Sequence, residues 1–262
     1  MMRSIYYTEE NPHFQYVLGL GDDVLVLGQR WSEWLSKGPN LELDITASNL
    51  ALDLIGQTDL LLSHAADLAG KGQNSDDLAY LRDTHDFRNH WLCEQPNGDW
   101  GVTIARMFMF SVYQYIRYER LMKSSDVKLS EIAAKAFKEA TYHRRFATEW
   151  TMRLAHGTTE SKQRLQNGFK QLWRFTPELF ETPDWERKLA DQGIAVASED
   201  IFAEWDEVID SIFAEAELEK PVFTGGVIGS RHDGHHSEHL GHMLCAMQYL
   251  QRVYPTAQGA KW

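Results

Sequence analysis

The sequence predicts an all-α protein, an antiparallel helix bundle, and three observations carry that prediction. Apolar side chains recur at helical spacing along most of the 262 residues, and no strand-like alternation of any length interrupts them. Two of the predicted helices are about 30 residues long, so each would span roughly 40–45 Å. Tight turns join the long helices, which makes neighbouring helices antiparallel. These observations define a bundle and leave open which kind of bundle it is.

The predicted elements follow one another with recognisable start and stop signals. Their ranges are 22–36, 41–68, 75–94, 100–122, 126–155, 159–181, 184–191, 198–218 and 237–253. Lys37-Gly38-Pro39 stops the first helix, and Asn40 can cap the second. Gln95-Pro96-Asn97-Gly98 is a strong turn after the third helix. The segment 220–233 is rich in glycine and short on periodicity, so we expect one long loop there.

The helix predicted over 100–122 should lie at the centre of the bundle. Its residues are mostly aromatic and apolar, as Phe108 and Ile116 illustrate. A helix that is apolar around most of its circumference is buried. We expect a single domain over 1–262, with extra helices toward the C-terminus and an N-terminal extension over 1–13 that could be mobile.

Composition and charge exclude several classes of protein. The net charge of −12 argues against nucleic-acid binding, which depends on cations that contact phosphate. The two cysteines, Cys93 and Cys245, form no CxxC motif, so a disulfide-stapled secreted domain is not expected. No signal peptide is visible, and the apolar runs are far below membrane-spanning length. A cytoplasmic protein that binds no membrane is the simplest expectation.

A polar stripe runs along the helix predicted over 41–68. Its members recur at helical spacing and are Glu42, Thr46, Asn49, Asp53, Gln57 and His64. The rest of that helix is largely Leu, Ile and Ala, so we expect the stripe to face other polar groups inside the protein. Bundles that bind two irons carry Glu-x-x-His pairs on such helices. Here that slot holds Leu54-Ile55-Gly56-Gln57, so the frame is present and the ligands are missing.

The helix predicted over 126–155 offers a second polar set. Its members lie one turn apart and are Glu131, Lys135, Glu139 and His143. Three interpretations stay open: an exposed stripe of salt bridges, an internal polar cluster without metal, and a metal site. The internal cluster would combine Asp53, Gln57, Arg106, Glu139 and His143. A di-iron site needs several converging carboxylates, and the central helix supplies none between Trp100 and Tyr118. Arg106 in that core would replace the charge of a metal.

The densest histidine cluster lies near the C-terminus, over 232–242. Its candidate members are His235, His236, Glu238, His239 and His242. Histidines one helical turn apart have the geometry of zinc ligands, although the full metalloprotease motif HExxH is absent. The alternative is that Ser237 and its neighbours cap the last helix, while the imidazoles hydrogen-bond to groups of the bundle or of a partner.

Seven stretches in a fixed order carry a resemblance to a known family. They are LGLGDDVLVLGQR (18–30), LELDITASNLALDLIGQ (41–57), EQPNG (94–98), KEATYHRRF (138–146), LWRF (172–175), HSEHLG (236–241) and MQYLQRV (247–253). Together they resemble the C subunits of bacterial phenylacetyl-CoA 1,2-epoxidases, which are multicomponent monooxygenases of phenylacetate catabolism. The stretches cover nearly the whole chain and are specific as a set. Residues 1–13 extend beyond the resemblance.

The resemblance implies a ferritin-like bundle and a hetero-oligomeric complex. In that family a sister A subunit holds the di-iron centre, activates O₂ and epoxidises the ring of phenylacetyl-CoA. A reductase E subunit passes electrons from NADPH through flavin and iron–sulfur groups, and a small B subunit helps assembly. The C subunit is similar to a degenerate A subunit that acts as a scaffold, with no metal, cofactor or catalytic residue of its own. The substrate would be bound mainly by the partner.

The same resemblance also assigns individual positions. Leu54 and Gln57 occupy positions like the Glu and His ligands of the sister subunit. His143 corresponds to a retained ligand, with Ala140 where a Glu would be needed. Two functional hypotheses therefore stand side by side. One is a non-catalytic scaffold subunit of the epoxidase. The other is a stand-alone metal-binding enzyme that uses Glu139 and His143 or the cluster over 232–242.

Overall fold

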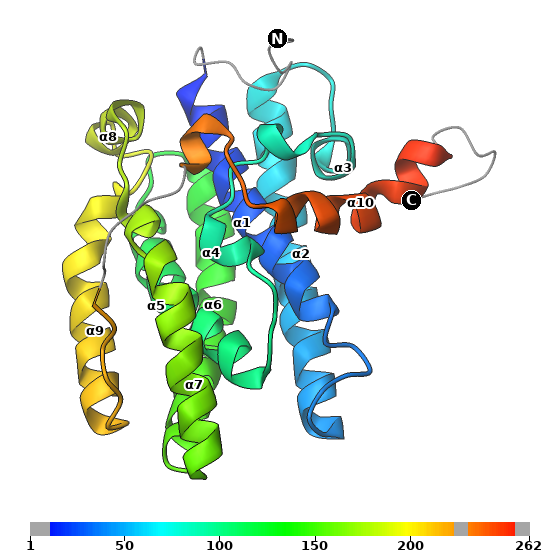
Figure 1. Ribbon diagram of the computed structural model, residues 1–262. Helices are drawn as coiled ribbons and strands as arrows, with labels where there is room; N and C mark the ends of the chain where they lie inside the picture. The colour runs from blue at the N-terminus through cyan, green and yellow to red at the C-terminus, as the bar shows by residue number, and fades with distance from the viewer. Residues whose placement is uncertain (1–10, 223–229, 255–262) are drawn as a thin grey trace. The chain divides into compact units, whose positions relative to one another are not determined.

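The computed structural model describes residues 11–222 and 230–254, and these ranges contain helices and no strand (Figure 1). This confirms the all-α prediction and is consistent with a ferritin-like helix bundle. The chain divides into two compact units. Unit 1 comprises residues 1–95 and 229–262, and unit 2 comprises residues 96–228. The single domain over 1–262 stays a prediction, because compactness alone does not test whether the units fold independently.

Unit 1 is built on two long helices that lie along each other. Its helices are α1 (Pro12–Ser32), α2 (Leu41–Ala69), α3 (Ser75–Tyr80), η1 (Thr84–Asp86), α4 (Trp91–Glu94), η5 (Arg231–Asp233) and α10 (Glu238–Val253). Glycines on α1 let the two long helices approach. A Cβ at Gly21 would lie 2.6 Å from a methyl carbon of Leu62, and one at Gly28 would lie 3.3 Å from Leu54. Side chains larger than hydrogen would therefore separate α1 from α2.

The structure corrects the predicted start of the first helix. We predicted residues 22–36, whereas α1 begins at Pro12, after the side chain of Asn11 accepts a hydrogen bond from the Phe14 N–H. Asp22, taken as the start, lies in the middle of the helix. The last residues of the predicted extension over 1–13 are therefore helical, and residues 1–10 of that extension lie outside the described residues.

The third predicted helix, over 75–94, is three short elements rather than one. Elements α3, η1 and α4 are separated by extended residues. The physical reason is that backbone groups in this segment form hydrogen bonds with side chains that are distant in sequence. The Arg88 N–H, for example, donates to Asp22 Oδ2 at 2.8 Å. A short irregular connection, with Gly98 at φ +57 in the left-handed region, joins α4 to the next helix at the predicted turn.

Unit 2 surrounds the helix predicted to be central. Its helices are α5 (Trp100–Leu121), α6 (Val127–Ala155), α7 (Thr159–Leu172), η2 (Trp173–Phe175), η3 (Pro177–Phe180), α8 (Asp184–Asp191), η4 (Ser198–Ile201) and α9 (Phe202–Glu215). Helix α5 is buried along nearly its whole length and packs against α6, α7 and α9. Its N-terminus is capped by Asp99, whose side chain accepts from the Val102 N–H at 3.0 Å. The prediction for this helix is confirmed.

Two helices of unit 2 are shorter than predicted. The helix expected over 159–181 ends at Leu172 and continues as two 3₁₀ turns, the second opening at Pro177. Proline has no N–H for an α-helical hydrogen bond, so the α geometry cannot continue through it. The helix expected over 198–218 opens with the 3₁₀ turn η4 and ends at Glu215.

Among the described helices, none combines the length and the apolar character needed to cross a membrane.

Candidate functional site

The five residues of the predicted polar cluster are divided between the two units. Asp53 and Gln57 lie on α2 of unit 1, and Arg106, Glu139 and His143 lie on α5 and α6 of unit 2. Three of them are buried, and the two acidic members are only half-buried. The cluster therefore stays a prediction, with its members on separate units.

The polar stripe on α2 does not face the interior along its whole length. Gln57 is 2% exposed and His64 is 5% exposed, as expected. Glu42 and Asn49 are exposed, so the prediction is wrong for these two residues. The stripe lies at the border of the buried side of the helix, and the N-terminal half of α2 is less covered than its composition predicts.

Helix α6 carries its charged residues mostly on the outside. Glu131 and Lys135 are exposed, and the Arg153 Nη2 atom lies 3.9 Å from the Glu149 carboxylate with both side chains more than half exposed. This geometry favours a solvated stripe for these residues. His143 is fully buried instead, so the four residues of this set do not share one environment.

The described residues of unit 2 do not fit a di-iron centre. Helix α5 contributes the buried cations Arg106 and Arg117 and no carboxylate between Trp100 and Tyr118. Arg106 donates to the Asn97 side chain in the turn before α5. The buried carboxylate of Glu186 instead accepts from the N–H and the hydroxyl of Ser198, at 3.0 and 2.8 Å. Two irons require several converging carboxylates, and buried guanidinium groups would repel them.

The histidines over 232–242 do not act together. His236 faces inward, with Nδ1 2.8 Å from Glu94 Oε2 and Nε2 3.0 Å from the Phe87 carbonyl oxygen. His235, Glu238 and His242 are exposed, and His239 is half-buried. Ser237 stands at the N-cap of α10, but its hydroxyl makes no cap hydrogen bond. The geometry favours hydrogen bonding within the protein, rather than zinc, for His236.

The most deeply buried chemistry of unit 1 is an ionic network that begins at Asp22. Its carboxylate accepts hydrogen bonds from both terminal nitrogens of Arg82, and Arg82 Nη1 lies 2.9 Å from Oδ2. Both side chains are fully buried. The N–H of Arg88 donates to the same carboxylate. A paired carboxylate with three donors has its buried charge compensated, which burial requires.

Asp23, the next residue, holds a second part of the network. Its Oδ1 accepts the His90 N–H at 2.8 Å and lies 2.9 Å from His90 Nδ1. Arg231 Nη1 lies 3.4 Å from Asp23 Oδ2 and 2.9 Å from His90 Nε2. Gly19 provides the space for this guanidinium, because a Cβ there would lie 2.7 Å from Arg231 Nη2. The chain that follows unit 2 is thus anchored in the core of unit 1.

Glu94 anchors the same returning segment at a second point. Besides His236, its carboxylate accepts the Ser237 N–H at 2.6 Å and the Asn89 side-chain amide at 2.9 Å. Its backbone carbonyl accepts Arg30 Nη2 at 2.5 Å. Every one of these groups belongs to unit 1, and each carboxylate of the network is held by protein donors. The network therefore fits a structural role rather than a metal site.

His232, beside this network, has a strongly lowered pKa of about 2. Burial is the largest cause, followed by the positive charge of Arg231 and by His90 and Arg88, while Asp23 acts in the opposite direction. The sequence patterns did not predict this network. One signal was available in the sequence, namely two adjacent aspartates within an apolar run. Charged residues in such a run are expected to be buried and paired rather than exposed to solvent.

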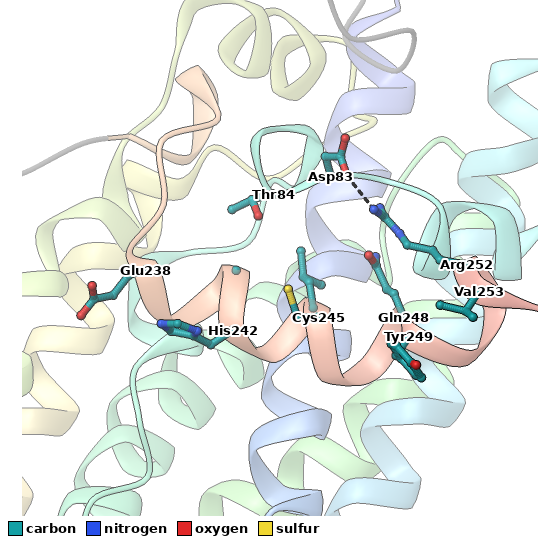
Figure 2. A pocket seen from close by; sticks show the side chains of 11 residues that line it. Asp83, Thr84, Glu238, His242, Cys245, Gln248, Tyr249, Arg252 and Val253 are labelled. Atoms are coloured by element: carbon teal, nitrogen blue, oxygen red, sulfur yellow. Dashed lines mark ion pairs between the residues drawn. The ribbon is translucent and has the colours of Figure 1, made fainter.

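An open pocket of about 590 Å³ lies beside α10 in unit 1 (Figure 2). Its lining residues are Asp83, Thr84, Glu238, Gly241, His242, Leu244, Cys245, Gln248, Tyr249, Arg252 and Val253. Figure 2 shows Glu238 and His242 at one end and the ion pair of Asp83 with Arg252 at the other. The Arg252 Nη1 atom lies 2.9 Å from the Asp83 carboxylate. The predicted residues Glu238 and His242 therefore border a pocket on the protein surface.

The fold and the site define an all-helical protein with an apolar core, in which unit 1 also contains a buried ionic network. Comparison with known proteins agrees with the resemblance noted in the sequence. The chain belongs to the phenylacetic acid catabolic protein family, whose model matches residues 4–262, so the match includes residues 4–13, which we had placed beyond the resemblance. It is 44% identical over 247 residues to the C subunit of the 1,2-phenylacetyl-CoA epoxidase of Escherichia coli (strain K12), and the match covers 94% of this chain and 98% of the relative.

Proposed function

We propose that the chain is the non-catalytic scaffold subunit of a phenylacetyl-CoA 1,2-epoxidase in aerobic phenylacetate catabolism. It would pair with the di-iron A subunit and stabilise it. The observation that carries the proposal is the 44% identity to the C subunit of such an epoxidase over 94% of the chain. Identity that extends over nearly all of both chains favours the same place in the same kind of complex.

The chemistry of the interior supports the non-catalytic part of the proposal. Where a di-iron protein needs converging carboxylates, α5 presents Arg106 and Arg117. A scaffold acts through its surface, by burying apolar area against the catalytic chain and fixing the helices of that chain. Interfaces of obligate complexes bury about 2,000–5,000 Å² in total.

The cofactors follow from this assignment. The chain would hold no metal or cofactor, because the di-iron centre belongs to the A subunit. NADPH, flavin and iron–sulfur groups belong to the reductase E subunit, and a B subunit completes the complex. The A subunit would bind most of phenylacetyl-CoA. A cytoplasmic location is part of the same proposal.

The first test measures metal in the purified chain after growth with added iron and zinc. We expect less than about a tenth of an equivalent, because the chain would offer too few converging ligands to hold a metal. Co-expression with the A subunit should then give one complex on gel filtration. One or two equivalents of metal, together with separate elution, would contradict the proposal. That outcome would favour a stand-alone metalloenzyme that uses Glu139 and His143 or the cluster over 232–242.

A further inference from the structure

One side of α2 exposes large aliphatic side chains at regular spacing. Leu41 is 70% exposed, Ile45 is 53% exposed and Leu52 is 68% exposed. Over residues 43–66 the exposed positions are Ile45, Asn49, Leu52, Gly56 and Asp59, which we call the α2 face. They alternate at spacings of four and three residues, so they form one stripe along the helix, and the aliphatic members of the stripe have the spacing that a second helix can pack against.

Crowding within the chain does not explain why position 56 on this face is a glycine. A glycine in a helix interior is less favourable than alanine. At the α1 glycines, Gly19, Gly21 and Gly28, an added Cβ would meet neighbouring atoms. At Gly56 it would meet nothing within 4 Å. A glycine in open space on a helix face that also exposes aliphatic side chains is accounted for when a partner backbone approaches it closely.

The charge of α2 indicates which kind of partner is complementary to the α2 face. Its acidic residues are Glu42, Asp44, Asp53, Asp59 and Asp67, and the helix contains no lysine or arginine. Two copies of this face would bring like charges together, which disfavours self-association. The net charge of −12 acts in the same direction. The face is therefore complementary to an apolar helix flanked by basic side chains.

We propose that the α2 face docks a helix of a different chain, with apolar residues at heptad spacing and lysine or arginine at its edges. This inference rests on the proposed function, since the different chain would be another subunit of the epoxidase. Apolar contact at Ile45 and Leu52 supplies the affinity, Gly56 allows the close approach, and the acidic residues of α2 select a basic partner.

The test measures the Kd of the full chain for the co-expressed epoxidase subunits. In Leu52→Lys the affinity should fall about tenfold or more, because a leucine buried at an interface contributes about 1.5–3 kcal/mol. Gly56→Leu should weaken binding similarly, while the free variant keeps the circular dichroism of a folded chain and a Tm no lower than that of the unaltered chain, because a Cβ at this position would meet nothing within 4 Å. The matched control is Val127→Lys, since Val127 is 69% exposed on α6 and Leu52 is 68% exposed.

The possible outcomes separate this inference from the proposed function. If the unaltered chain binds no epoxidase subunit, both fall. If it binds and both α2 variants bind equally well, or if the control loses as much affinity as they do, only the docking assignment falls. Sedimentation that shows self-association abolished by Leu52→Lys would make a second copy the occupant and overturn the proposal. Raising NaCl from about 50 to 500 mM should weaken binding; unchanged affinity would contradict a basic partner.

Discussion

Asp22 illustrates at the residue scale how the interior of unit 1 tolerates charge. An isolated carboxylate could not be buried, but here Arg82 and the Arg88 N–H satisfy its oxygens. Such a pair adds little net stability compared with apolar residues of the same size. It does impose a strong penalty on any arrangement that separates the partners. The network therefore specifies one arrangement of the chain around α1.

Replacing Asp22 with alanine should lower the free energy of unfolding by about 3–5 kcal/mol, because fully buried Arg82 would lose its counter-ion. Urea unfolding followed by circular dichroism measures the loss. Glu160→Ala is the control, since its ion pair with Arg164 on α7 is exposed and should be worth no more than about 1 kcal/mol. Equal effects in the two variants would show that the buried pair is not special.

His232 should make stability depend on pH. Its pKa is about 2 in the folded protein, against 6.5 for the free side chain, so the unfolded state binds one more proton between these values. Stability is then fully present above pH 6.5 and falls as the pH decreases. Between pH 7 and pH 5 the loss should be about 2 kcal/mol. His232→Gln should remove this part of the dependence, and urea unfolding at both pH values checks it. If the free energy of unfolding fell by the same amount between pH 7 and pH 5 in both proteins, His232 would not be the cause of the dependence.

The sequence identified the candidate residues only in part at this scale. Gln57 and His143 are buried as polar periodicity predicted, because helical spacing reports which side chains share a face. The partners of Asp22 and Asp23 could not be predicted, since Arg231 lies 208 residues from Asp23 in the chain. No local pattern encodes such a distant contact.

At the element scale, the start of α2 was predicted well from its cap, whereas the stop signal Lys37-Gly38-Pro39 placed the end of the first helix at residue 36 and α1 ends at Ser32. Asn40 caps α2 as predicted, and the helix ends before Gly70, which adopts the left-handed conformation. The start of α1 was wrong because Asp22 resembles an N-cap residue, and an N-cap aspartate and a buried, paired aspartate are the same letter in a sequence. The prediction of one helix over 75–94 was wrong for a similar reason, because backbone groups in this segment form hydrogen bonds with side chains that are distant in sequence.

Close packing of α5 on α7 should respond sharply to a single methyl group. A Cβ at Gly168 would lie 2.9 Å from the Val102 Cα atom, and backbone atoms cannot move aside as a flexible side chain can. Gly168→Ala should destabilise by about 1–3 kcal/mol. Gly56→Ala, with nothing within 4 Å, should stabilise by up to about 1 kcal/mol. Thermal unfolding of both variants measures the contrast, and a shift of the same sign in both would refute this account.

At the scale of the whole molecule, unit 1 is discontinuous in sequence. Its first part ends at Gln95, and its second part returns after unit 2. Arg231 and His236 attach this returning segment, and Gln248 on α10 adds hydrogen bonds of 3.0 Å to the Ala79 and Arg82 carbonyl oxygens. The integrity of unit 1 therefore depends on residues from both parts of the chain.

Loss of the Arg231 anchor should loosen α10 selectively. In Arg231→Met the amides of α10 should exchange with solvent about tenfold faster or more, because the buried Asp23 loses a positive partner. Hydrogen exchange read by mass spectrometry provides the measurement. Peptides from α7 serve as the internal control and should not change. Acceleration in α7 equal to that in α10 would indicate global destabilisation instead.

The discontinuity of unit 1 has a consequence for how the protein is made. A ribosome releases the N-terminal part first, so α1 and α2 emerge long before Arg231 exists. Unit 2, which is continuous, is complete while the last residues are still being translated. Asp22 can pair with Arg82 before unit 2 is made, whereas Asp23 must wait for Arg231 until the segment after unit 2 has been translated. During that interval the nascent chain carries an apolar helix with an aspartate that lacks its arginine partner.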